Sequence, residues 1–239
     1  GMREDICTIP INELFEPKKG CPICRMVDML EGRLAEYITG AAMMEPDVRI
    51  ETNRLGFCER HFAQIHDVGS RLSIALILES HLKEVEERAF AEEAAPKRKL
   101  FGSHSGGEEE HGTCFICENL ERNRDHLVEI LLNLWTKEEE FRRLFGEQEY
   151  FCLPHAKLLI RAAAARLPKK TAAPFCEEVR RLSLSYLQTV ESDVTHFCRM
   201  FDYRNKDGDW GNSKDAIERA IAYLTGRLYT PAANGEEKA

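Results

Sequence analysis

The feature that most constrains the fold of this chain is a pattern of metal-ligand residues that occurs twice. In each copy a CxxC motif is followed by a CxxH motif, after 33 residues in the first copy and 34 in the second. Each copy therefore supplies three sulfurs and one imidazole, the donor set of a closed tetrahedral zinc site. The two predicted quartets are Cys21, Cys24, Cys58 and His61, and then Cys114, Cys117, Cys152 and His155.

The residues around these ligands repeat as well. The segment CPICRMVDMLE resembles CFICENLERNR, and LGFCERH resembles EYFCLPH. Such self-similarity, at an offset of about 93 residues, indicates an internal duplication. We therefore expect two tandem helical units, each enclosing its own Cys3His metal site.

Apolar residues recur at helical spacing along most of the chain, and no alternating strand pattern is present. In the first unit we expect a helix from about Cys24 to Gly40, a short helix or turn over 45–53, and one long helix from Cys58 past Val85. The second unit is expected to contain helices over 117–135, 137–145 and 152–168, a long helix beyond Pro174, and a last helix between Asn212 as N-cap and Gly226 as stop. The predicted fold class is all-α.

The predicted domain organisation follows from the repeat and from a change in composition between its copies. Residues 1–91 form the first repeat and 114–230 the second, which includes a C-terminal helix. The segment 92–113 between them has blocks of like charge and no apolar periodicity, as is typical of a linker, often a disordered one. Residues 231–239 are a tail.

Both motifs suit the beginning of a helix. A spacing of three residues is close to one helical turn, so the two donors of each motif share a face. Helix N-termini carry partial positive charge, which favours nearby thiolates. A metal ion would therefore tie two helix starts together. We also expect His61 and His155 to donate the unligated ring nitrogen to a carboxylate or a carbonyl.

Four protein ligands leave no position for a catalytic water, so the sites are predicted to be structural. The chain also lacks HExxH, P-loop, GxGxxG and GxSxG motifs, so no set of residues points to an enzymatic activity. We expect two zinc ions per chain; an iron–sulfur cluster and redox-active CxxC thiols remain alternatives. The three cysteines outside the motifs are expected to be buried as small apolar residues: Cys7, Cys176 and Cys198.

Composition narrows the choice of partner. The formal net charge of −8 argues against nucleic acid, since DNA and RNA binders need clustered positive charge. The chain contains no run of about 18 apolar residues, so no membrane span is expected. The N-terminal residues lack the basic start and apolar stretch of a signal peptide, which favours a cytoplasmic location. The remaining expectation is a protein partner.

Further motifs carry a resemblance to a known family. These are TIP at 8–10, CPIC at 21–24, MEPDVR at 44–49, GFCERH at 56–61, DYRN at 202–205 and WGNSKD at 210–215. Together they resemble an uncharacterised bacterial family with paired CPxC and GFCxxH motifs, which implies a bacterial cytosolic protein but no activity or substrate. The sequence thus predicts a zinc-binding helical protein that acts as a structural or protein-interaction module. The alternative is a redox- or metal-responsive regulator acting through its zinc thiolates.

Overall fold

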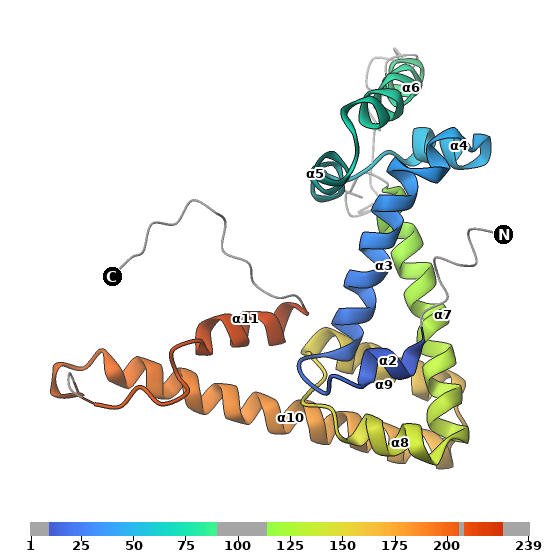
Figure 1. Ribbon diagram of the computed structural model, residues 1–239. Helices are drawn as coiled ribbons and strands as arrows, with labels where there is room; N and C mark the ends of the chain where they lie inside the picture. Colours follow the sequence, from blue (N-terminus) through green and yellow to red (C-terminus); the bar gives the residue numbers. More distant parts are fainter. Residues whose placement is uncertain (1–9, 90–113, 206–207, 227–239) are drawn as a thin grey trace, which may run out of the picture. The chain divides into compact units, whose positions relative to one another are not determined.

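The computed structural model describes residues 10–89, 114–205 and 208–226, and all regular structure within them is helical (Figure 1). The predicted all-α class is confirmed. The α-helices are α2 (Ile11–Phe15), α3 (Pro22–Thr39), α4 (Pro46–Leu55), α5 (Glu59–Val68), α6 (Arg71–Ala89), α7 (Phe115–Lys137), α8 (Glu139–Gly146), α9 (Leu153–Arg166), α10 (Lys169–Met200) and α11 (Ala216–Thr225). Two short 3-10 helices are η1 (Ala41–Met44) and η2 (Tyr203–Asn205). None of the helices described is long and apolar enough to cross a membrane.

The chain divides into two compact units along a different line from the predicted one. Of the described residues, the first unit takes 28–89 and 114–124, and the second takes 10–27 together with everything from 125 onward. The boundary falls inside α3 and α7, so each of these helices begins in one unit and ends in the other. The predicted linker 92–113 and tail 231–239 lie outside the described residues.

The first unit is built around the apolar faces of α3, α4, α5 and α6 and the start of α7. Its fully or nearly buried side chains include Leu30, Leu34, Ile38, Val48, Leu55, Phe57, Ile65, Ile77, Phe115 and Ile116. Helix α4 packs on α6 and is held there by polar contacts. The Arg49 guanidinium donates to the carbonyl of Leu76 at 2.6 Å, and the ring of His81 donates to the carbonyl of Asn53 at 2.8 Å.

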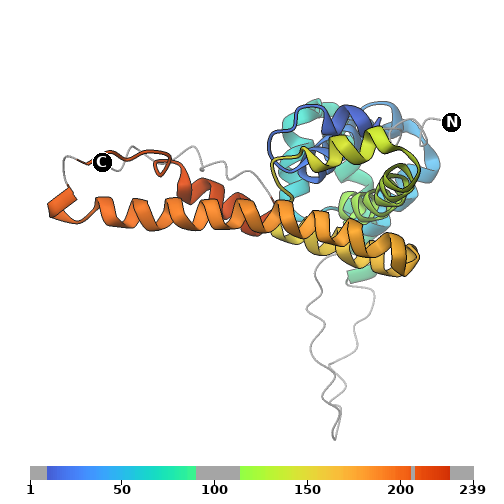
Figure 2. The ribbon, with the colours of Figure 1, turned by 90° about the horizontal axis from the view of Figure 1, so that it is seen from below.

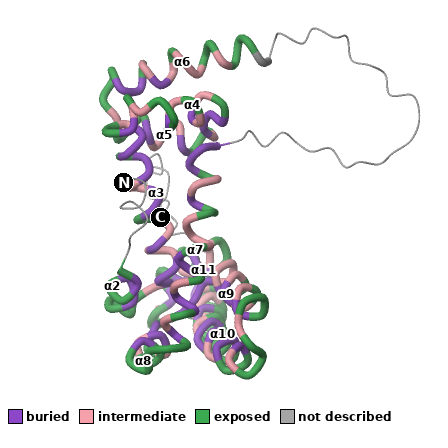
Figure 3. Tube along the Cα trace, turned by 90° about the vertical axis from the view of Figure 1, so that its right-hand side faces the viewer, coloured by how far each residue is buried: buried purple, intermediate pink, exposed green. Residues whose placement is uncertain are grey.

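The single long helix predicted after Cys58 is wrong, because the chain forms α5 and α6 with a break at Gly69. Gly69 is extended, with ψ 154°, and the Ser70 hydroxyl accepts the backbone N–H of Ser73 at 3.1 Å, which caps α6. The break changes which face of α6 is buried. Ile77 packs inside, whereas Leu72 is 68% exposed, and exposed residues follow α6 along its length (Figure 3).

The second unit has an aromatic core. Phe145 lies at its centre, with ring centroids 4.8 Å from Phe151, 5.2 Å from Phe175 and 5.8 Å from Phe15. Phe15 belongs to α2, so the segment before Cys21 contains a short helix that packs on α8. The long helix α10 runs beside α9 and α11 (Figure 2).

Two boundaries in the second unit differ from the prediction. Helix α10 begins at Lys169, five residues before Pro174, which the helix accommodates in its second turn. The N-cap of α11 is Asp215 rather than Asn212. Gly226 ends α11 in the left-handed region, with φ 73°, as predicted.

Candidate metal centres

The structure gathers all eight predicted ligands into two Cys3His clusters, but with their partners exchanged. Site A consists of Cys21, Cys24, Cys152 and His155, and site B of Cys58, His61, Cys114 and Cys117. Each CxxC motif thus meets the CxxH motif of the other copy. The predicted grouping within one repeat is wrong, although every residue proposed as a ligand belongs to a cluster.

Site A lies in the second unit and is largely enclosed. The Cys24 and Cys152 sulfurs are 3.7 Å apart. The Nδ1 atom of His155 lies 3.1 Å from the Cys152 sulfur, 3.4 Å from that of Cys24 and 3.7 Å from that of Cys21. Cys21 and Cys152 are 3% and 0% exposed.

Site B lies in the first unit and has the same arrangement. The Cys58 and Cys117 sulfurs are 3.9 Å apart, and Nδ1 of His61 lies 3.2 Å from the sulfurs of Cys58 and Cys114 and 3.4 Å from that of Cys117. His61 and Cys114 are buried, whereas Cys117 is exposed. Site B is therefore the more accessible of the two.

These distances are those of a tetrahedron around one ion. With zinc bonds of about 2.3 Å to sulfur and about 2.05 Å to nitrogen, the edges would measure about 3.8 Å between sulfurs and about 3.5 Å between sulfur and nitrogen. All ligand atoms within each site lie within 4.8 Å of one another. The sulfurs are also well beyond the bond length of a disulfide, about 2.05 Å. The residues present fit a single tetrahedral ion in each site.

The four motifs share one local structure. The first cysteine of each motif directly precedes a helix, and the second donor is the third residue of that helix, as expected from the spacing. In each case the carbonyl of the first cysteine accepts the first helical hydrogen bond, for example from Phe62 to Cys58 and from Ala156 to Cys152, both at 2.8 Å. Each site therefore joins two helix N-termini, whose partial positive charge stabilises thiolates.

Backbone contacts bring the two motifs of site B together. The carbonyl of Gly56 accepts the N–H of Phe115 at 2.9 Å, which places Cys58 beside Cys114. Gly56 has φ +59°, and a Cβ atom there would lie 2.7 Å from the ring of His81. A side chain is therefore excluded at this position. The glycine of the GFC motif serves close packing, not metal binding.

A corresponding contact joins the two segments of site A. The backbone N–H of Glu149 donates to the carbonyl of Lys18 at 3.0 Å, and its carboxylate accepts the N–H of Gly20 at 2.6 Å. These bonds hold the loop before Cys21 against the segment that leads to Cys152. Both clusters are thus supported by the chain itself.

Helix length explains why the partners are exchanged. Helix α3 has 18 residues and carries the chain about 27 Å from the CPIC motif, at 1.5 Å per residue. Helix α4, with 10 residues, spans only about 15 Å and is too short to return the chain to that motif before Cys58. The same imbalance exists between α7, with 23 residues, and α8, with 8. The CxxH motif of each copy is therefore delivered away from its own CxxC motif.

The thiols of site A cannot all ionise without a cation. Burial raises the pKa of Cys21, but its contacts with Cys152, Cys24 and His155 outweigh burial and bring this pKa well below its usual value. The contact with Cys21 in turn raises the pKa of Cys152 to about 12. One thiolate is favoured at the expense of its neighbours, because like charges repel. A divalent cation would remove this conflict.

In site B, too, the pKa of one cysteine is lowered and that of a neighbouring cysteine is raised. Burial raises the pKa of Cys114, but the contact with His61 and backbone N–H groups lower it to about 6. Burial and the charge of Cys114 raise the pKa of Cys117 to about 12. Both sites therefore have the electrostatics of a cation-binding cluster.

Sequence reasoning missed one residue that orients a ligand. The Nε2–H of His61 donates to the carboxylate of Glu31, in α3, at 2.7 Å, and Glu31 also forms an ion pair with Arg60. This contact leaves Nδ1 of His61 free to bind a metal. It confirms the expectation of a carboxylate or carbonyl partner for His61. Glu31 was not identifiable from the repeat, because the second copy has Arg124 at the equivalent position.

We predict that Glu31→Ala weakens metal binding at site B by about 10- to 100-fold, the range seen when such partners of metal-bound histidines are removed. Competition with a chelator would measure the metal affinity of site B in the purified protein. Glu36→Ala, an exposed substitution on the same helix, is the matched control and should leave affinity unchanged. Equal affinities in both variants would contradict an orienting role for Glu31.

The end of α11 covers site A. The carbonyl of Gly226 lies 3.0 Å from the Cys24 sulfur, and a Cβ atom on Gly226 would lie 3.2 Å from the Cys152 sulfur. Gly226 is thus required both for its left-handed backbone and for the space it leaves above the cluster. The WGNSKD motif at 210–215 contributes by docking this helix: the Trp210 ring packs on Phe197 of α10 and on Phe201 just beyond its end, at 5.5 and 5.8 Å between centroids.

Gly226→Ala should destabilise the protein more than Gly211→Ala does. Both glycines have positive φ, so each alanine costs about 1–2 kcal/mol of backbone strain. Nothing lies within 4 Å of a Cβ at Gly211, whereas the Gly226 variant also presses on Cys152. Urea unfolding would measure both effects. Equal losses of stability would show that α11 does not seal site A.

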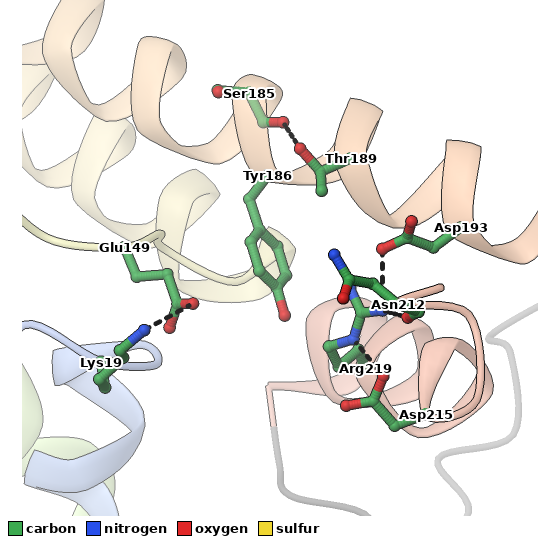
Figure 4. A pocket seen from close by; sticks show the side chains of 9 residues that line it. All are labelled: Lys19, Glu149, Ser185, Tyr186, Thr189, Asp193, Asn212, Asp215 and Arg219. Atoms are coloured by element: carbon green, nitrogen blue, oxygen red, sulfur yellow. Dashed lines mark hydrogen bonds and ion pairs between the residues drawn. The ribbon is translucent and has the colours of Figure 1, made fainter. Parts of the chain in front are cut away.

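A polar pocket of about 560 Å³ lies elsewhere in the second unit (Figure 4). It is lined by Lys19, Glu149, Ser185, Tyr186, Thr189, Asp193, Asn212, Asp215 and Arg219. Arg219 contacts the carboxylates of Asp193 at 2.8 Å and Asp215 at 2.9 Å, and Lys19 faces Glu149 at 4.0 Å. The charges pair with one another, and Arg219 serves to fasten the loop before α11 to α10.

The cysteines outside the clusters behave differently from one another. Cys176 is buried, as expected, at 7% exposure. Cys198 is exposed, so the expectation of burial is wrong there; the helix turns this residue toward solvent. Cys7 lies outside the described residues.

Comparison with known protein families identifies the chain. Its sequence matches the family of unknown function DUF6062 over residues 2–231. The chain belongs to this family. The resemblance drawn from the CPIC, GFCERH and WGNSKD motifs is thereby confirmed, and the match covers both sites. Searches of curated proteins and of solved structures find no match.

Proposed function

We propose that this DUF6062 protein is a zinc-stabilised helical protein in which each of two structural ions joins a pair of helix N-termini. The observation that carries the proposal is that four donor distances in each cluster, between 3.1 and 3.9 Å, agree with the edges of a tetrahedral zinc site. Three thiolates and one imidazole complete the coordination of the ion. Because such a sphere is closed, the proposed role of the metal is structural.

The same distances favour one ion over the alternatives. Cysteines bound to different irons of a cluster are held further apart than cysteines on one ion, whereas here all donors lie within 4.8 Å. Redox chemistry of the thioredoxin type takes place within one CxxC motif in a βαβ setting. Here each CxxC motif faces a CxxH motif, in helical surroundings.

Zinc would connect segments that are distant in the sequence. Site A joins Cys24 to Cys152, 128 residues away, and site B joins Cys58 to Cys117, 59 residues away. Structural zinc contributes on the order of 10 kcal/mol to the folding of small modules. Net stabilities of whole domains are about 5–15 kcal/mol. The proposed ions are therefore major determinants of stability.

We also infer that the two sites arose by duplication of a CxxC–CxxH segment whose copies exchange partners. The shared position of all donors at the first and fourth residues of each motif supports this inference. Exchange makes the two copies depend on each other. Neither copy alone contains a complete site.

A protein partner is proposed because α6 presents large apolar side chains to solvent. Leu72 and Leu82 are 68% and 62% exposed. The double substitution of both leucines by glutamine should leave zinc content unchanged while abolishing binding to a partner recovered with the wild-type protein. If the double variant still bound the partner, this face of α6 would not be the binding surface.

Metal analysis of untagged protein tests the main proposal. We expect about two zinc ions per chain by mass spectrometry of the native protein, since each site is complete. Cys198→Ser, at the exposed cysteine outside the clusters, should also retain two. Protein that folds normally without zinc, or that carries iron with visible absorption, would contradict the proposal.

The alternative of a redox-responsive regulator gains support from one observation. Cys117 is exposed, whereas the cysteines of site A are buried or half-buried. Reactivity at zinc thiolates requires such access. The alternative therefore applies to site B.

A further inference from the structure

The two clusters have the same donors but different access to solvent. At the third position of the CxxC helix, site A has Cys24, which is half-buried beneath the carbonyl of Gly226, and site B has Cys117, which is exposed. The remaining members of site B are less accessible: Cys58 is half-buried, and Cys114 is 3% exposed. A small reagent in solution therefore reaches one sulfur first, and it is the sulfur of Cys117.

The neighbour of Cys117 is placed to react with it. The Cys58 sulfur lies 3.9 Å away, in contact but not bonded. Both residues stand at helix N-termini, Cys58 directly before α5 and Cys117 in the first turn of α7, so two helices present the two sulfurs to each other. An exposed cysteine beside a second cysteine that can form a disulfide with it is the arrangement of redox-sensitive cysteines.

We propose that Cys117 is an oxidation site for hydrogen peroxide and small hydroperoxides, and that it then forms a disulfide with Cys58. The proposal rests on the zinc-binding function proposed above, and it makes site B the labile one of two otherwise similar sites. Site A keeps its ion under the same conditions because Cys21 and Cys152 are buried and α11 covers the cluster.

The chemistry requires only the hydroperoxide as oxidant. The Cys117 thiolate attacks the terminal OH oxygen of the peroxide, the O–O bond breaks, and hydroxide leaves from hydrogen peroxide or alkoxide from an organic hydroperoxide, which gives a sulfenic acid. The Cys58 thiolate then attacks the Cys117 sulfur, the S–O bond breaks, and hydroxide leaves as the disulfide forms. The two sulfurs lose two electrons and the peroxide gains them. Site B retains one thiolate and one imidazole, too few donors to hold its ion.

The test is the amount of zinc released from the full-length protein by hydrogen peroxide, followed with a metal-sensitive dye. We expect one of the two ions to be released, at a rate at least about tenfold above that of the second. Peptide mapping should identify a disulfide between Cys58 and Cys117. Reductant and added zinc should restore the original content of two ions.

Two variants test this assignment. Cys117→His keeps a nitrogen donor for zinc but removes the reactive sulfur, so peroxide should release no ion rapidly. Cys198→Ser removes an exposed sulfur outside both clusters and should release one ion as the wild type does. Equal release from both sites, or rapid release from Cys117→His, would overturn the proposal. A wild-type protein without two zinc ions would instead contradict the proposed function.

Discussion

A chain carrying both Cys21→Ser and Cys152→Ser should retain one zinc ion, because both residues belong to site A. Serine has nearly the size of cysteine but supplies no thiolate. A chain carrying Cys21→Ser and Cys58→Ser should retain none, because these residues belong to different sites. Native mass spectrometry of the two double variants would distinguish one ion from none.

This comparison decides the pairing directly. If each repeat bound its own ion, the two double variants would give the opposite result, with one ion lost from the Cys21 and Cys58 pair. The single variants Cys21→Ser and Cys152→Ser serve as controls, and each should retain one ion. The test depends only on counting ions.

The second large effect is expected for Cys58→Ala, which should unfold the first unit. The substitution removes one of four ligands from site B, and the loss of a structural ion costs on the order of 10 kcal/mol. This loss is as large as the whole net stability of an ordinary domain, about 5–15 kcal/mol. Circular dichroism should show reduced helix content and a lower melting temperature.

Cys198→Ala is the appropriate control, because Cys198 is exposed and outside both clusters. It should melt like the wild type. If Cys58→Ala also kept the wild-type melting temperature and metal content, site B would not be a structural metal site.

Local structure was largely predictable because it depends on neighbouring residues. The helix from Pro22 to Thr39 was expected from apolar spacing and from Gly40 beyond its end. The left-handed stop at Gly226 followed from the same reasoning. Donors three residues apart at a helix start share a face whatever they bind, so the local geometry of all four motifs could also be anticipated.

Errors arose where an apolar pattern continued across a break. Phe62, Ile65, Val68 and Leu72 recur at helical spacing, yet the chain breaks at Gly69 and Ser70 because the serine caps a new helix. Leu72 consequently faces solvent and Ile77 the core. Periodicity alone does not report a change of helix axis.

By itself, the sequence determined the chemistry of this protein: eight soft donors in four motifs, each set at the start of a helix. Only the tertiary structure decided which motifs meet, because either pairing satisfies the ligand count. Helices α4 and α8 are too short to bring the chain back over the length of α3 and α7, so each CxxC motif meets the CxxH motif of the other copy. The same long-range packing places Glu31 against His61 and leaves Cys117 exposed, and neither relation is encoded in local spacing.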